Sequence, residues 1–297
     1  MTMSLPTLRQ LRFLVTLAEE GNFSRAADIC HVTQPTLSAA IKELESTLGV
    51  TLVERGARGA TLTPAGEAAV DRARSTLAEA EDLVQAARAA GEPLSGPFRL
   101  GVIPTIAPFL LPKLLPVLSK AHEKLQLYLR EDLTDRLMDG LRARTLDAAL
   151  IALPYDAQGI ETTTVGSDEF LFACAPDHRL ASKDAIAPAD LDNEKLLMLE
   201  DGHCLRDHAL AVCSAAASRS DFAATSLHTL AQMVKSGLGA TLLPRLAVDG
   251  GVTDGLDLVV KPFTPAIIGR EIGIAWRKGS AREKEARLIA ETLKGVV

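Results

Sequence analysis

The sequence is poor in aromatic residues and cysteine, and its net charge is modest. Only 4% of its 297 residues are aromatic, four are cysteine, and the formal net charge is −6. No apolar run approaches the ~20 residues of a membrane span, and the start of the chain lacks the pattern of a signal peptide. So few cysteines exclude a disulfide scaffold, and a disulfide in a reducing compartment is usually transient. We therefore expect a cytoplasmic protein that does not bind a membrane.

Three motifs with well-defined chemistry are also missing. The sequence has no Cys-x-x-Cys pair, no His-Glu-x-x-His segment and no phosphate-binding Gly-Lys-Ser loop. We therefore expect neither a metal nor another cofactor. The negative net charge argues against nucleic-acid binding over the whole surface, so any DNA contact must come from a local patch.

Residues 5–66 begin with the signals of two short helices. Apolar side chains recur at helical spacing from Leu8 to Leu17. Ser24 is then placed to cap a second helix over residues 25–30. The apolar faces of these two helices would pack against each other.

A third helix is predicted after a tight connection. Thr33 can cap it, and Pro35 is tolerated in its first turn. Opposite its apolar stripe lies a small, polar face with one positive charge, Lys42, which suits a helix in the major groove of DNA. A three-helix bundle that binds protein would use the same stripes, and residues 1–66 hold equal numbers of basic and acidic residues.

A β-hairpin, or wing, is predicted next. Its first strand covers residues 51–55 and its return covers residues 58–63. Arg55 and Arg58 on this wing are candidate contacts to DNA phosphates or to the minor groove.

A long helix starts at Thr63 and Pro64 and runs to about residue 90. Its apolar residues alternate steps of three and four, which predicts a seam for a partner helix. The seam consists of Val70, Ala73, Leu77, Ala80, Val84 and Ala87. Because two paired DNA-binding domains fit a two-fold symmetric operator, we expect a homodimer or a homotetramer.

After a linker rich in Gly and Pro at residues 91–97, strands and helices alternate. This predicts an α/β domain with ligands at the carboxyl ends of its strands. Strands are expected at 98–103, 125–131, 148–153, 169–175, 196–199, 240–243, 256–260 and 267–276, and helices at 108–120, 134–144, 204–217, 226–236 and 281–294. The last strand and helix can return to the first lobe, which gives two lobes around a cleft.

Cys204 opens one of these predicted helices, and Cys213 follows it by nine residues. The helix N-terminus, with His203 and Arg206 nearby, is expected to lower the thiol pKa. Nine residues of intact helix span ~13 Å and place the two side chains on opposite faces, whereas a disulfide needs Cα atoms within ~7 Å. A bond between the two would therefore require refolding and act as a switch. Alternatively, they are unrelated thiols, one at a turn and one in the core.

Several short blocks between residues 23 and 66 occur in a fixed order. They are Phe-Ser-Arg-Ala-Ala, Thr-Gln-Pro-Thr-Leu-Ser, Lys-Glu-Leu-Glu, Leu-Gly-Val, Glu-Arg and Leu-Thr-Pro-Ala-Gly. Together they resemble the winged helix-turn-helix of LysR-type transcriptional regulators. The resemblance implies binding to double-stranded promoter DNA and contact with RNA polymerase. The residues expected at the DNA are Ser24, Arg25, Thr33, Gln34, Pro35, Thr36, Ser38, Lys42, Arg55 and Arg58.

The remainder resembles the periplasmic-binding-protein-like effector domain of that family. The expected organisation is a DNA-binding domain (1–66), a dimerisation helix (67–90) and an effector domain (91–297). Within the last, lobe I covers about 91–166 and 275–297, and lobe II about 167–274. The segments Lys195–Asp207 and Ala224–Leu227 and the later Cys213 resemble the peroxide-sensing subgroup. This implies that Cys204 is the peroxidatic thiol and Cys213 the resolving one, in a reversible disulfide.

Other side chains suit this chemistry. Thr105, in the first strand-to-helix loop, offers a hydroxyl that both donates and accepts hydrogen bonds. His203 and Asp207 can position a peroxide or move a proton. Arg277, at the end of the last strand, can hold an anion, or it can be a surface arginine beside Lys278.

These features predict a hydrogen-peroxide-sensing transcriptional regulator, mainly an activator of oxidative-stress genes, and not an enzyme. Further expected partners are other copies of the chain and a thiol reductant such as glutaredoxin or thioredoxin. Two alternatives stay open. One is a LysR-type regulator that binds a small organic effector in the interlobe cleft, with incidental cysteines. The other is a thiol peroxidase with an accessory domain.

Overall fold

The computed structural model describes residues 5–56, 59–89, 92–192, 194–212 and 218–297. These form two compact units, which divide between Ala87 and Arg88. The predicted Cys213 and Arg58 lie outside the described residues. No described helix combines the length and the apolar character needed to cross a membrane.

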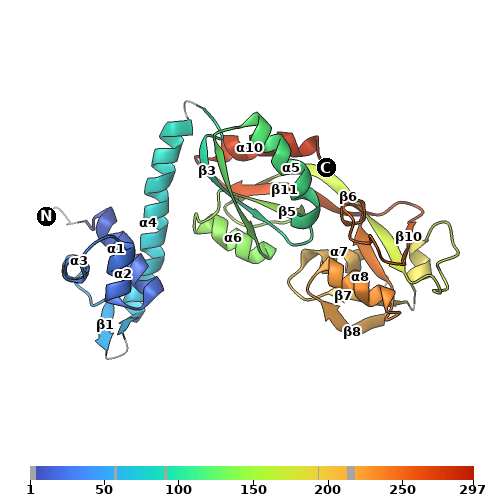
Figure 1. Ribbon diagram of the computed structural model, residues 1–297, viewed down its shortest axis with the longest axis horizontal. Helices are drawn as coiled ribbons and strands as arrows, with labels where there is room; N and C mark the ends of the chain where they lie inside the picture. Colours follow the sequence, from blue (N-terminus) through green and yellow to red (C-terminus); the bar gives the residue numbers. More distant parts are fainter. Residues whose placement is uncertain (1–4, 57–58, 90–91, 193, 213–217) are drawn as a thin grey trace. The chain divides into compact units, whose positions relative to one another are not determined.

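The N-terminal unit is a helix-turn-helix followed by a hairpin and a long helix (Figure 1). Its elements are α1 (Leu8–Glu20), α2 (Phe23–Ile29), α3 (Gln34–Leu48), β1 (Val53–Gly56), β2 (Gly59–Leu62) and α4 (Pro64–Ala89). The three short helices enclose a core of apolar side chains that includes Leu14, Leu37 and Leu44. The sequence therefore predicted this order of elements correctly.

Local capping chemistry sets the helix boundaries. The hydroxyl of Thr33 accepts a hydrogen bond from the backbone N–H of Thr36, as expected for the cap of α3. The expected cap of α2 at Ser24 is wrong. Asn22 caps this helix instead, because its side-chain oxygen accepts from the backbone N–H groups of Ser24 and Arg25 at 2.9 and 3.1 Å.

Only part of the predicted seam on α4 is open to a partner. Val70 and Ala73 are buried at 3% and 2% exposure, and Val70 belongs to the core of the N-terminal unit. Leu83 and Val84, farther along the helix, are 72% and 48% exposed. The exposed apolar side chains Leu83 and Val84 therefore lie in the later turns of α4.

The C-terminal unit is built on a mixed seven-stranded sheet, in the order β10–β6–β11–β5–β3–β4, with β9 paired to β6. The strand β3 is parallel to β4 and β5, whereas β11 runs antiparallel to β5 and β6. A separate parallel pair joins β7 and β8. The strands are β3 (Gly96–Val102), β4 (Leu125–Glu131), β5 (Ala148–Leu153), β6 (Ile160–Cys174), β7 (Lys195–Leu199), β8 (Ser218–Ala224), β9 (Thr241–Pro244), β10 (Val259–Pro262) and β11 (Ile268–Arg277).

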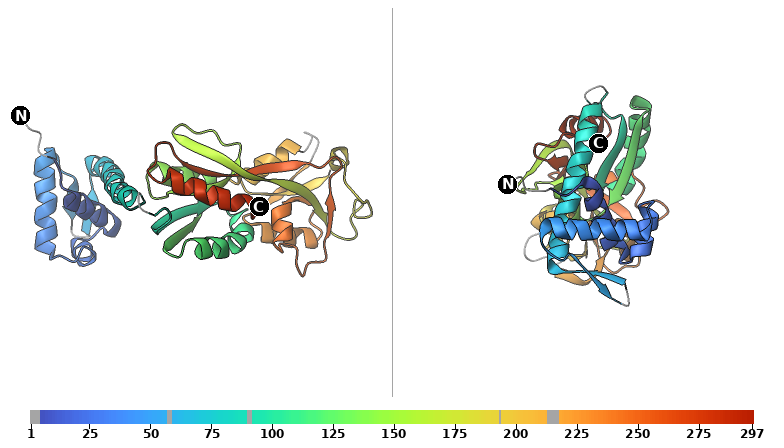
Figure 2. Two further views of the ribbon diagram at one scale, coloured as in Figure 1. Left: turned by 90° about the horizontal axis from the view of Figure 1, so that it is seen from above. Right: turned by 90° about the vertical axis from the view of Figure 1, so that its left-hand side faces the viewer.

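Helices cover this framework on both sides. They are α5 (Ala107–Ala121), α6 (Thr134–Arg142), α7 (Cys204–Val212), α8 (Leu227–Lys235), α9 (Arg245–Asp249) and α10 (Glu283–Lys294), with a 3₁₀ turn at Pro188–Leu191. Figure 2 shows α10 lying along the sheet, where it packs on β6 and β11. The long strands β6 and β11 run from the part that holds β3–β5 to the part that holds β7, β8 and β10 (Figure 1).

Three expectations about this unit are wrong. The strand β6 begins at Ile160 rather than at residue 169, because its first half pairs with β11 although it lacks a strongly apolar pattern. Of the helix expected over residues 204–217, the structure describes α7 at Cys204–Val212, the rest lies outside the described residues, and the strand β8 from residue 218 was not expected. The short helix α9 was not expected.

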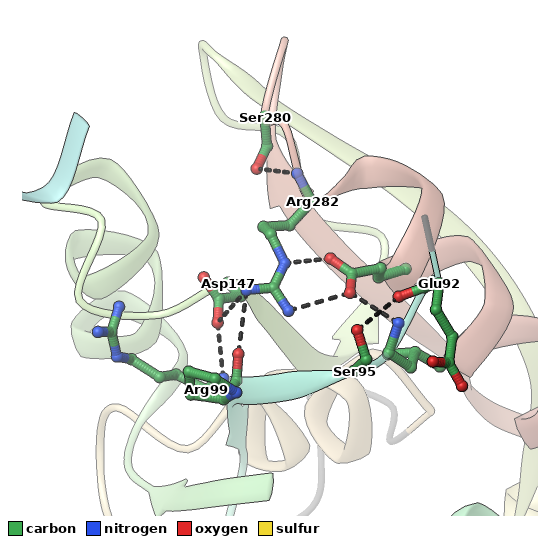
Figure 3. A network of polar contacts seen from close by, with 9 residues as sticks. Glu92, Ser95, Arg99, Asp147, Ser280 and Arg282 are labelled. Carbon is green, nitrogen blue, oxygen red and sulfur yellow. Dashed lines mark hydrogen bonds and ion pairs between the residues drawn. The ribbon is translucent and has the colours of Figure 1, made fainter. Parts of the chain in front are cut away.

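A buried polar network holds the start of this unit to its last helix (Figure 3). The carboxylate of Glu285 on α10 accepts a hydrogen bond from the backbone N–H of Leu94 at 2.8 Å and also pairs with Arg282. Arg282 in turn donates to the carbonyl oxygen of Pro97 at 3.0 Å. Asp147 accepts from the backbone N–H of Arg99 at 2.7 Å, and its burial raises its pKa. The end of the linker, at Leu94 and Pro97, is therefore held against α10.

Candidate functional site

Cys204 is the first residue of α7 and is half-buried. The turn before it reverses the chain after β7, and Gly202 adopts a φ of +95°, a conformation that glycine favours. Arg206, one turn along α7, donates to the carbonyl oxygen of Leu199 at 3.2 Å and pairs with Asp201 at 3.2 Å. These contacts tie the start of α7 to the end of β7.

The carboxyl ends of three parallel strands meet around the Cys204 sulfur. Thr134 begins α6 after β4, and its hydroxyl is a buried neighbour of the thiol. Ala152 near the end of β5 contributes a backbone hydrogen bond. Thr105 lies in the turn between β3 and α5 and is 3% exposed. The site thus lies where open α/β sheets place their ligands.

A buried arginine, Arg270 on β11, connects these elements. Its Nη1 donates to the Thr105 hydroxyl at 2.7 Å, and its Nη2 donates to the Thr105 carbonyl oxygen at 3.0 Å. Its charge also lowers the pKa of Cys204. Asp168 on β6 holds the other side of the guanidinium, at 3.1 Å from Nε and 2.9 Å from Nη2. A single fixed cation therefore faces both Thr105 and the thiol.

The net electrostatic effect on the thiol is opposite to the expectation. Burial raises the pKa of Cys204, and this outweighs the lowering by Arg270, by the Thr134 hydroxyl and by backbone hydrogen bonds. Arg206, expected to stabilise a thiolate, is paired with Asp201 instead. Burial also lowers the pKa of His203, against a smaller effect of Glu200, and so favours a neutral ring. In this conformation the uncharged thiol is favoured.

The structure places the remaining predicted site residues as follows. Arg277 lies seven residues after Arg270 on the same strand, ~23 Å away in an extended chain, opposite Ile160 and near Arg144. Arg277 therefore lies at the far end of β11 from the arginine that contacts Thr105, which is Arg270. The backbone of Asp207 belongs to α7, but its side chain is outside the described part of the chain.

The predicted DNA face of α3 is open to solvent. Gln34, Pro35, Thr36 and Lys42 are exposed, and Ser38 is partly exposed. The hydroxyls of Thr33 and Thr36 share a hydrogen bond at 2.8 Å. Arg25 on α2 is exposed and pairs with Glu20 at 3.4 Å. The backbone of Arg55 lies in β1, whereas its side chain is outside the described residues.

Sequence reasoning missed Thr134, Asp168 and Arg270. Each carried a weak signal. Asp168 and Arg270 are charges beside apolar strand patterns, each followed by a glutamate, and charged side chains are rarely buried. Thr134 follows the carboxyl end of a predicted parallel strand, where ligands bind. The pairing of Asp168 with Arg270 depends on the register of β6 and β11, in which the two residues lie directly opposite each other.

Two family models match the chain. One, the bacterial regulatory helix-turn-helix protein of the lysR family, matches residues 8–67, and the other, the LysR substrate binding domain, matches residues 91–297. Among curated relatives, the hydrogen peroxide-inducible genes activator of Escherichia coli O157:H7 is 43% identical, covering 97% of this chain and 94% of the relative. The HTH-type transcriptional regulator EstR of Acinetobacter baylyi is 42% identical, over 99% of this chain and 98% of its own.

Solved structures agree with this assignment. A full-length OxyR point mutant from Pseudomonas aeruginosa superimposes with a TM-score of 0.78 at 37% identity and covers 99% of each chain. Since the similarity extends over both units, it includes the helix-turn-helix as well as the strands that surround Cys204. The chain belongs to the LysR family of bacterial helix-turn-helix regulators.

Proposed function

We propose that this chain is a DNA-binding transcriptional regulator, mainly an activator, that senses hydrogen peroxide through Cys204. The single observation that carries the proposal is that the Cys204 thiol lies beside the buried Thr134 hydroxyl and in the field of the buried cation Arg270, which also holds the Thr105 hydroxyl. Arg270 reaches both the thiol and Thr105, and Thr134 adjoins the sulfur. A small molecule with an O–O bond needs donors, an acceptor and a nucleophile of this kind. The relatives named for peroxide-inducible genes support the same assignment.

The chemistry starts with loss of the thiol proton, for which the neutral ring of His203 is the proposed acceptor. The thiolate then attacks one peroxide oxygen, so that an S–O bond forms and the O–O bond breaks. The departing hydroxide takes a proton and leaves as water. Arg270 stabilises the negative charge on sulfur and on the leaving oxygen. Thr105 and Thr134 each donate to one oxygen and accept from the other.

The resulting sulfenic acid is resolved by Cys213. The Cys213 sulfur attacks the Cys204 sulfur, an S–S bond forms, and the oxygen leaves as water. Across the sequence, two thiols are oxidised and one peroxide is reduced to two waters. A dithiol reductant of the glutaredoxin or thioredoxin type would reverse the bond by thiol–disulfide exchange.

The signal is proposed to be the refolding of residues 200–217. Residues 204–212 form a continuous helix in this structure. A disulfide needs the Cα atoms of Cys204 and Cys213 within ~7 Å. Nine residues of helix would hold these atoms ~13 Å apart, so the bond requires the helix to unfold. Because Arg206 ties α7 to β7, refolding of α7 would release those contacts and alter the surface of the effector domain.

The output is proposed to be a change in DNA and polymerase contact by a dimer or tetramer. The proposed organisation keeps the expected boundaries, with a DNA-binding domain at 1–66, a dimerisation helix at 67–90 and a two-lobed effector domain at 91–297. The exposed Leu83 and Val84 on α4 support the dimerisation helix. The exposed polar face of α3 supports major-groove contact.

Three cysteine variants test this function in the same transcription assay. We expect Cys204→Ser and Cys213→Ser to bind promoter DNA and to lose the response to peroxide. The matched control is Cys30→Ser, which is expected to respond normally because Cys30 lies in the N-terminal unit. A peroxide response retained by Cys204→Ser would remove the proposed sensor.

A second candidate function is regulation by a small organic effector. EstR is as similar to this chain as the peroxide-inducible activators are, and its name mentions no peroxide. Mass spectrometry of peroxide-treated protein separates the two. A peptide that links Cys204 to Cys213 supports the peroxide sensor, whereas its absence alongside an intact DNA-binding protein supports the effector-binding regulator.

A further inference from the structure

Asp168 is a buried charge next to the site that the peroxide chemistry does not use. Its side chain is 2% exposed, and that of its partner Arg270 is 0% exposed. The two residues are cross-strand neighbours, since Arg270 on β11 lies directly opposite Asp168 on β6. Side chains directly opposite each other project from the same face of a sheet. The pairing is therefore built into the register of the two central strands.

Asp168 determines how the guanidinium of Arg270 is oriented. Its Oδ2 accepts from Nε at 3.1 Å and from Nη2 at 2.9 Å. Because the guanidinium is planar, a carboxylate held at this edge fixes the plane of the whole group. The opposite edge then presents Nη1 to the Thr105 hydroxyl at 2.7 Å. Of the five N–H groups of arginine, the second one on Nη1 has no protein partner assigned among the described residues and is available to the thiolate or to a bound peroxide.

Asp168 is itself held rigidly. Its second oxygen, Oδ1, accepts from the backbone N–H of Leu246 at 2.9 Å. Leu246 lies in the first turn of α9, directly after β9, which pairs with β6. The carboxylate therefore has a backbone anchor on one side and the cation on the other, and its position does not depend on the mobile side chain of another residue.

Asp168 also offsets the charge of Arg270. A buried arginine without a counter-charge would act on the neighbouring sulfur with its full field, because the protein interior screens charges weakly. From β11 the charged group that faces Cys204 is Arg270, from α6 the neighbour is the neutral Thr134, and from β5 it is backbone. Along its own segment, His203 and Arg206 adjoin Cys204, and Arg206 is paired with Asp201. No other described cation therefore takes over the role of Arg270.

We propose that Asp168 is a positioning residue of the peroxide reaction, which orients Arg270 at Cys204 and Thr105 and offsets its positive charge there. This proposal rests on the proposed function. The carboxylate does not touch peroxide or sulfur and acts only through the guanidinium. Its effect has two parts of opposite sign. The negative charge keeps the resting thiol protonated, whereas the fixed plane of Arg270 speeds the attack on peroxide.

The test uses Asp168→Asn in the reduced full-length chain. The rate at which iodoacetamide alkylates Cys204 is followed against pH by mass spectrometry of its peptide. The amide removes the charge with little change of shape, so the midpoint of alkylation is expected to fall by about one pH unit. The rate of oxidation by hydrogen peroxide, divided by the thiolate fraction, is expected to fall about tenfold. A midpoint that stays or rises overturns the proposal.

The neighbouring Glu169 supplies the matched control. It lies on the same strand, is partly exposed and pairs with Arg245 at 2.8 Å. Glu169→Gln is expected to leave both the midpoint and the oxidation rate unchanged. Because alkylation needs neither peroxide nor a disulfide, the midpoint tests the effect of Asp168 even if Cys204 proves not to be the sensor.

A second variant covers the case in which Asp168→Asn does not fold. Asp168→Glu keeps the charge and displaces the carboxylate by one methylene. It is expected to leave the alkylation midpoint near that of the unmodified chain and to slow peroxide oxidation. If peroxide oxidises Cys204 in folded Asp168→Glu as fast as in the unmodified chain, the positioning role is overturned.

Discussion

The backbone N–H of Leu94 donates a hydrogen bond to the carboxylate of Glu285 across 191 residues of the chain, at a distance of 2.8 Å. Leu94 is 1% exposed, and its φ of +56° is a left-handed conformation that leucine rarely adopts. The same carboxylate neutralises Arg282, which lies 5.0 Å from the centre of the Phe98 ring. One side chain therefore satisfies a buried cation and holds the linker in a costly conformation.

Replacing Glu285 by Ala should destabilise the C-terminal unit strongly. The change leaves the buried Arg282 with only the Asp147 carboxylate, 3.9 Å away, as a counter-charge, and loss of one partner of a buried ion pair typically costs about 3–5 kcal/mol. We expect urea unfolding to show a loss of this order. Glu283→Ala is the control, because the Glu283–Arg287 pair is exposed and such pairs contribute about 0–1 kcal/mol. Equal losses for the two variants would contradict the anchoring role.

Substituting Lys42 by Ala should weaken DNA binding without changing sequence preference. Lys42 is exposed on the outward face of α3, where a cation would contact a phosphate. Loss of one phosphate contact should lower the slope of log binding constant against log salt by about one. Fluorescence anisotropy at several salt concentrations measures this. Lys120→Ala on α5 is the control and should bind as the unmodified chain does.

The sequence predicts structure correctly where that structure depends on residues close together in the chain. The start of α3 is set by Thr33 and Pro35, and its end by Gly49, whose φ is +71°. By contrast, the pair of Asp168 and Arg270 joins residues 102 positions apart. Only the register of β6 and β11 brings them together. Because this pairing is non-local, the sequence pattern pointed to Arg277 at the end of the strand and not to Arg270.

The thiol pKa was misjudged for a related reason. The N-terminus of α7 and the nearby basic residues are visible in the sequence and favour a thiolate. The burial of Cys204 by α6 and β5 is a property of the tertiary fold, and it dominates. Local charge can therefore be read from a sequence, but the desolvation that opposes it cannot.

His203 should make the stability of the reduced protein fall in mild acid. Burial lowers its pKa, so the folded chain binds a proton less readily than the unfolded chain does. Below the ordinary value of about 6.5, the unfolded form gains a proton that the folded form does not accept. This stability is complete above that pH and is lost as the pH falls through it.

His203→Gln should remove this part of the pH dependence. Unfolding midpoints measured between about pH 5 and pH 7.5 should then change less than those of the unmodified chain. His31→Asn is a suitable control, because His31 is exposed and Asn tolerates its φ of +52°. A variant of His203 that keeps the full pH dependence would assign it to other groups.

Thr134→Val should slow oxidation of Cys204 by peroxide while preserving the fold. Valine has nearly the shape of threonine, but the thiolate loses the hydroxyl that lowers its pKa. In the resting protein the buried Thr134 hydroxyl has no hydrogen-bond partner among the described residues, so its removal leaves no unpaired group behind. A hydrogen bond to a charged group contributes about 1.5–3 kcal/mol, which corresponds to at least about a tenfold loss of rate. Thr134→Ser retains the hydroxyl and should restore most of the rate, and failure of Ser to do so would assign the effect of Val to packing.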